Sequence, residues 1–244
     1  MPQIRKVILS FVVLALAGSP ALASTWNFAS GGNPVTSNGS HYGNQLVFDA
    51  GPAELRVRAW SNTGRHPTGS FETASILRFS TGLGVCNRKE GSINSCIGGS
   101  LDHQVDNVSQ QDLVLFLFDS LQVMQSLTID PWGTWDRDVS FRVGTVSPDV
   151  SLTGATFSSL GTLGFGSQVN SLNGPGEGPV TINLGGLTGN ALLIGALNPY
   201  DGSPDRFKIR QLVTSTPMTV VPLPGAGWLL LSALGFLAGN RRSA

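Results

Sequence analysis

Acidic and amide side chains are concentrated in one stretch of the chain, and their types suit the binding of a hard metal ion. The 23 positions from 90 to 112 hold six potential ligands, namely Glu90, Asp102, His103, Asp106, Asn107 and Asp112. Loop oxygens are the ligands that Ca²⁺ prefers, so a possible calcium cofactor would use Glu90, Asp102, Asp106 and Asn107. EF-hand spacing is absent, however, and Asp and Asn in loops commonly bond their own backbone and build turns. The turn-building role is the favoured alternative.

Residues for catalysis are sparse. Three histidines occur, His41, His66 and His103, and none lies in a His-Glu-x-x-His motif. The Gly-x-Ser-x-Gly turn of serine hydrolases is also absent. The sequence therefore predicts a protein without enzymatic activity, and a secreted hydrolase with a dispersed Ser/His/Asp arrangement is the less favoured alternative.

The two cysteines, Cys86 and Cys96, lie ten positions apart. In an exported protein such a pair usually forms a disulfide, and closing so short a loop stabilises a fold by about 2.5–3 kcal/mol through chain entropy. A metal site would need further soft ligands, and the chain has no Cys-x-x-Cys motif. The sequence therefore predicts a structural disulfide.

Charge is low and balanced, with 15 Lys and Arg against 15 Asp and Glu, and charged residues make up 12% of the chain. Such a chain has no basic surface to neutralise phosphates, so we expect no nucleic-acid partner. The 31 glycines favour turns over helices. Residues 24–219 have the size of a single domain.

Alternation of apolar and polar residues predicts strands. In AELRVRAW, one face carries Leu55, Val57 and Ala59 and the other carries charged residues. The segments DVSFRVG, VTINL and RFKIRQ alternate in the same way. The runs LVLFLF (113–118) and ALLIGA (191–196) are apolar on both faces and predict central strands covered on each side, with a buried helix as the alternative.

Turn-rich segments such as SGGNPVTSNGS and NPYDGSPD separate these strands. About eight to eleven short strands joined by such turns predict an all-β fold, with a single β-sandwich or jelly-roll-like domain. No fixed repeat period supports a β-helix. Residues 151–179 are almost uncharged and fit either a long loop or weak edge strands.

Exposed aromatic residues on a sandwich face could stack on sugar rings. The candidates are Trp60, Trp132 and Trp135, although core packing is the more common fate of a tryptophan. A carbohydrate-binding module is therefore an alternative to a purely structural role.

The N-terminus has the layout of a secretory signal peptide. Arg5 and Lys6 precede an apolar run, and Ala21-Leu22-Ala23 forms a small-x-small cleavage site before Ser24. The apolar run of about eleven residues is too short to span the bilayer, which disfavours an uncleaved anchor. We expect residues 1–23 to direct export through the Sec machinery and to be removed between Ala23 and Ser24.

The C-terminal segment 220–244 combines a proline-rich motif, an apolar run and two arginines. Residues 226–239 would form a helix about 21 Å long, so they make a marginal transmembrane helix. Arg241 and Arg242 would hold the end of the chain in the cytoplasm. The prolines keep the preceding segment extended, which suits either a protease site or a plain spacer.

This arrangement resembles the tripartite PEP-CTERM sorting signal in its VPLPA variant, with Val221, Pro222, Leu223, Pro224, Gly225 and Ala226 as the motif. Gly225 stands where the variant has Ala. The resemblance implies an exosortase-like membrane enzyme as partner, residence in the inner membrane through a single-pass helix, cleavage near the prolines, and a final place at the cell surface or outside the cell.

Short segments of the body, among them GLGVCNRKEG, LDHQVDN and QDLVLFLF, also resemble a group of exosortase-dependent surface proteins over residues 82–213. This group implies no activity. The sequence thus predicts an exported surface or matrix protein with a structural or binding role and with exopolysaccharide as a possible partner.

Overall fold

Strands dominate the part of the chain that the computed structural model describes. The described residues are 22–29, 36–37, 41–49, 53–64, 68–90, 96, 103–131 and 133–217. They form β1 (Ala23–Asn27), β2 (Thr36–Ser37), β3 (Leu46–Asp49), β4 (Glu54–Asn62), β5 (Phe71–Thr73), β6 (Ser75–Phe79), β7 (Gly82–Cys86), β8 (Val105–Asp106), β9 (Asp112–Asp130), β10 (Val139–Gly144), β11 (Val169–Ser171), β12 (Val180–Ala196), β13 (Arg206–Ser215) and one 3₁₀-helix, η1 (Phe157–Leu163). The all-β prediction is confirmed.

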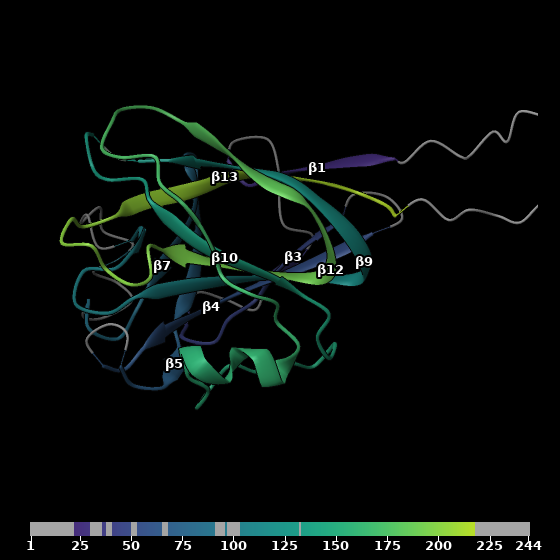
Figure 1. The fold of residues 1–244 in the computed structure, drawn as a ribbon, viewed down its shortest axis with the longest axis horizontal. Coiled ribbons are helices and arrows are strands. Elements are labelled where there is room, and N and C mark those ends of the chain that lie inside the picture. The colour runs from purple at the N-terminus through teal and green to yellow at the C-terminus, as the bar shows by residue number, and fades with distance from the viewer. Residues whose placement is uncertain are drawn as a thin grey trace, which may run out of the picture. The chain divides into compact units, whose positions relative to one another are not determined.

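The strands pair antiparallel, and two long strands organise them. The main path of the sheet runs β11-β10-β12-β9-β13-β7-β6, with β4 also on β9. The first half of β9 pairs with β4 and with the end of β12, whereas its second half pairs with β13 and with the start of β12. A register shift in β12 between Gly189 and Ala191 separates the two halves, and another between Asn183 and Leu187 interrupts the pairing with the second half of β9. Such irregularities bend strands, so β9 and β12 turn a single sheet back on itself (Figure 1).

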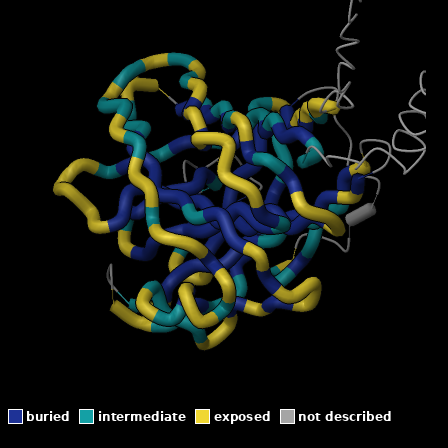
Figure 2. The backbone as a smooth tube through the Cα atoms, turned by 45° about the vertical axis from the view of Figure 1, so that its right-hand side comes forward, coloured by how far each residue is buried: buried dark blue, intermediate teal, exposed yellow. Residues whose placement is uncertain are grey.

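The main hydrophobic core lies between the two halves of this sheet. It unites Val114 and Phe116 from the first half of β9 with Leu127 and Ile129 from the second half. Figure 2 shows this buried interior inside a surface of exposed loops. The alternation predicted for β4 is confirmed, because Leu55, Val57 and Ala59 are buried, whereas Glu54 on the opposite face is exposed.

A second core covers the other face of the first half of β9. Leu113, Leu115 and Leu117 pack there with Leu152 and Leu160, which belong to the segment that carries η1. LVLFLF is therefore a strand buried on both faces, as predicted, and the alternative of a buried helix is wrong. Residues 151–179, for which a loop or edge strands were expected, contain η1 and the short edge strand β11.

The predicted disulfide is present. Cys86, the last residue of β7, is bonded to Cys96, and their Cα atoms lie 6.0 Å apart. Both cysteines are buried and pack with Leu77. The bond therefore ties the segment that follows β7 to the body of the domain.

The two ends of the described unit, Leu22–Pro217, lie side by side. β1 and β13 are antiparallel, with Ala23 opposite Ser215, and the backbone N–H of Thr216 donates to the carbonyl oxygen of Leu22 at 3.1 Å. The predicted cleavage point between Ala23 and Ser24 thus falls at the start of β1. Residues 1–21 and 218–244, which hold the rest of the predicted signal peptide and the sorting motif, lie outside the described residues. Within the described residues no helix has the length and hydrophobicity to cross a membrane.

Candidate functional site

Three carboxylates from separate segments meet where β4, β7, β8 and β9 come together. Glu90 lies in the turn after β7, Asp106 ends β8 and Asp112 begins β9. One oxygen of each lies within 4.8 Å of the others. We call these three residues the β9 carboxylate cluster.

A glycine allows β8 to reach this position. A Cβ atom on Gly84 of β7 would lie 1.8 Å from the carbonyl oxygen of His103, so only glycine permits so close an approach of the two backbones. The backbone N–H of Val85 donates to the carbonyl oxygen of Gln104 across the same contact at 3.4 Å. This contact places Asp106 beside Asp112.

Backbone and amide donors orient the carboxylates of the cluster. Glu90 accepts from the backbone N–H of Asn87 at 2.8 Å, and Asp106 accepts from that of Val108 at 2.9 Å. Asp112 accepts from the side-chain amide of Asn87 at 3.0 Å. Asn87 therefore holds two members of the cluster at once.

Asp112 is fully buried. Burial, and after it the charges of Glu90 and Asp106, raise the pKa of this carboxyl well above its usual range. Removing a carboxylate from water disfavours its charged form, and like charges nearby add to the effect. The fold thus brings two further acidic side chains close to a buried carboxyl group.

A second group of carboxylates, Asp136, Asp138 and Asp205, lies near the start of β13, and their oxygens also approach one another within 4.8 Å. Several hydrogen bonds satisfy this second group. Asp205 accepts from the side-chain amide of Asn107 at 2.6 Å and from the backbone N–H of Asp138 at 3.0 Å. Asp138 accepts from the backbone of Asn173 and Gly174. These contacts are typical of carboxylates that organise loops.

Stability should depend on pH through Asp205, because burial and then the charge of Asp136 raise the pKa of this carboxyl to about 7. A raised pKa in the folded state means that protonation favours folding. The contribution is fully present below the pKa of the unfolded chain, about 3.9, and is lost as the pH rises through about 7. We expect the free energy of unfolding, measured by urea denaturation in EDTA, to fall over this range by on the order of 3 kcal/mol.

The variant Asp205→Asn should lose this part of the pH dependence. It should also be less stable at low pH, because its amide group would face an N–H donor. If the free energy of unfolding of this variant changed with pH as it does in the parent chain between about pH 4 and 8, the assignment of the titration to Asp205 would be contradicted.

The structure brings together only part of the ligand set predicted from the sequence. Glu90 and Asp106 meet, but their third partner is Asp112, which was not among the four predicted ligands. Asn107 is not part of the β9 carboxylate cluster, because its amide donates to Asp205 and its side-chain oxygen accepts from the Asp205 backbone at 3.0 Å. Asp102 lies outside the described residues.

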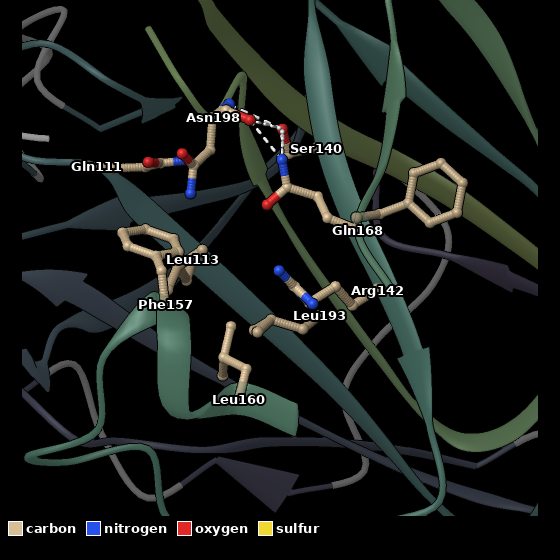
Figure 3. A pocket seen from close by; sticks show the side chains of 10 residues that line it. Gln111, Leu113, Ser140, Arg142, Phe157, Leu160, Gln168, Leu193 and Asn198 are labelled. Carbon is tan, nitrogen blue, oxygen red and sulfur yellow. Dashed lines mark hydrogen bonds between the residues drawn. The ribbon is translucent and has the colours of Figure 1, made fainter. Parts of the chain in front are cut away.

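A shallow depression lies on the face of the sheet that carries η1 (Figure 3), with a cavity volume of about 10 Å³, which is space for about one water molecule. One wall is apolar and includes Phe157 and Leu160, and the other carries the amides of Gln168 and Asn198. The hydroxyl of Ser140 bonds the backbone N–H of Asn198 at 2.7 Å and receives the Gln168 amide at 3.4 Å. The amide wall is thus held rigidly in place.

The aromatic and histidine candidates are scattered. Trp60 is fully buried and therefore cannot stack on a sugar. Trp135 is partly exposed, with the Arg206 guanidinium 4.6 Å from its ring centre. The ring of His103 lies 4.6 Å from that of Phe79. Trp132 and His66 lie outside the described residues.

Comparison with known proteins adds no assignment: no protein-family model, curated protein or solved structure matches this chain. The resemblance of the C-terminal segment to a PEP-CTERM signal therefore stays a prediction.

Proposed function

We propose that this protein is an exported, non-enzymatic component of the cell surface or extracellular matrix, built on a jelly-roll-like β-sandwich. The observation that carries the proposal is the tripartite C-terminal segment 220–244, combined with a signal-peptide pattern at the other end of the chain. The Cys86–Cys96 disulfide supports it, because disulfides persist in oxidising compartments outside the cytoplasm.

An exosortase-like enzyme would retain the protein at the inner membrane through its tail and cut near Pro222 and Pro224. Ala23 lies opposite Ser215, so the N-terminus expected after removal of the signal peptide lies at the same end of the described unit as the residues that lead into the C-terminal segment.

Mass spectrometry of the protein from the cells that produce it tests this proposal. We expect an N-terminus at Ser24 and a C-terminus between Val221 and Ala226. An intact C-terminus at Ala244 would contradict processing, and a cytosolic chain with both ends uncut would overturn export as well. Replacing Arg241 and Arg242 with glutamate should reverse the cationic bias and reduce the fraction retained in membranes.

A carbohydrate-binding role is the second candidate. A sugar would rest on the open surface around Phe157 in Figure 3, because the cavity there is too small to enclose a ring. An aromatic ring beside fixed amides suits a sugar, whose apolar face packs on the ring while its hydroxyls bond the amides. A glycan array should then show binding that Phe157→Ala abolishes and Trp135→Ala does not. An array without reproducible binding would leave the structural role as the function of the domain.

A further inference from the structure

The β9 carboxylate cluster combines features that point to an ion. Its three acids come from three segments, the turn after β7, the end of β8 and the start of β9. Backbone N–H groups and the side-chain amide of Asn87 donate hydrogen bonds to the three carboxylates and orient their oxygens. Arg88, two residues before Glu90, lies 3.5 Å from Glu72 and over the ring of Tyr42.

A buried hydroxyl beside the cluster supplies an independent observation. Ser61 lies directly opposite Asp112 in the antiparallel pairing of β4 with β9, so the two side chains are on the same face of the sheet, about 5 Å apart at Cβ. This is the face of the main core, since Ala59 and Val114, two positions away on each strand, belong to it.

Ser61 is fully buried, and its hydroxyl oxygen has no hydrogen-bond partner among the described residues. A buried hydroxyl that makes no hydrogen bond is unfavourable and uncommon in folded proteins. Its position across from Asp112 makes this oxygen the candidate for a fourth ligand at the cluster.

We propose that the three carboxylates, together with the hydroxyl of Ser61, bind one Ca²⁺ ion at this end of the domain. An all-oxygen ligand set of mostly charged groups suits a hard divalent cation. Ca²⁺ is favoured over Mg²⁺ because ligands from four separate segments suit its larger and more flexible coordination shell. The sulfurs of Cys86 and Cys96, which lie close to Glu90, are joined in a disulfide and are not thiolate ligands.

The ion would link β4, β8 and β9 to the turn that the disulfide holds. It would bring positive charge to the three carboxylates and give the Ser61 oxygen a partner. The inference does not depend on cleavage of the C-terminal segment.

Calorimetry and thermal unfolding of the full chain, purified in mild detergent and stripped with EDTA, test the proposal with Ca²⁺ as the probe. We expect one ion per chain, half-saturation at or below about 1 mM, and a rise in Tm. Mg²⁺ at the same concentration should give a smaller rise. Absence of both heat and a Tm change at about 10 mM Ca²⁺, well above the range for extracellular modules, would overturn the proposal.

One substitution in the cluster and two controls outside it locate the site. Asp112→Asn keeps the size of the side chain and should weaken Ca²⁺ binding at least about tenfold, whereas Asp205→Asn in the neighbouring group and Asp149→Asn in an exposed turn should not. Loss of binding in Asp205→Asn, with binding retained in Asp112→Asn, would refute the assignment.

Ser61→Ala distinguishes a ligand from a purely structural residue. In EDTA this variant should be as stable as the parent chain or more stable, because it removes a buried polar group without a partner. In Ca²⁺ its affinity should fall severalfold. An unchanged affinity would remove Ser61 from the site and with it the independent support for the ion.

Discussion

Trp60→Ala is expected to lower the free energy of unfolding by about 3–5 kcal/mol, the range for deleting a large aromatic side chain from a packed core. Trp60 is fully buried in the second core, between the sheet and the segment that carries η1. Its indole N–H also donates to the hydroxyl of Thr153 at 3.2 Å. The substitution would therefore create a cavity and leave that segment with fewer contacts to the sheet.

Trp135→Ala is the matched control, because it removes the same side chain from a partly exposed position. This substitution should lower the free energy of unfolding by only about 1 kcal/mol, mainly because the stacking with Arg206 is lost. Urea denaturation of the two variants measures both values. Equal losses would mean that Trp60 does not occupy a packed core.

Gly84→Ala should destabilise the domain by about 3 kcal/mol or more, at or beyond the upper end for overpacking. The added methyl would meet a backbone carbonyl, that of His103, at 1.8 Å. A backbone atom cannot rotate away as a side chain can, so β7 and the segment before β8 would have to separate. Asp106 would then move from Asp112, and the variant should also bind Ca²⁺ more weakly.

Gly161→Ala provides the comparison for this substitution. Gly161 lies in η1, and a Cβ atom there would have nothing within 4 Å. We expect a change within about 0.5 kcal/mol. Equal stability of Gly84→Ala and Gly161→Ala in urea denaturation would show that β7 and β8 are not in close contact.

Much of the strand content could be predicted because local patterns encode it. In β4, the alternation of Leu55, Val57 and Ala59 with charged residues predicted which face is buried. In β9, a run of residues that is apolar on both faces correctly predicted a strand buried on both faces. The disulfide followed from having only two cysteines. These features depend on near neighbours in the chain, and local residue patterns record such relationships well.

The composition of the β9 carboxylate cluster could not be predicted in the same way. Asp112 meets Ser61 through the register of β4 on β9, a pairing between residues 51 positions apart. A shift of that register by one residue would turn every side chain to the other face, and local patterns do not fix it. Asn107 was misplaced for the same reason, since its partner Asp205 is 98 positions away.

The antiparallel pairing of β1 with β13 also determines how the domain would respond to mechanical force. With Ala23 opposite Ser215, tension applied between the two termini would peel these strands apart one hydrogen bond at a time. Tension between the C-terminus and a ligand at the far end of β13 would instead run along the strand and load its hydrogen bonds together, since they lie across the strand axis. The domain should therefore unfold at a lower force when tension acts between its termini than when tension acts between the C-terminus and such a ligand.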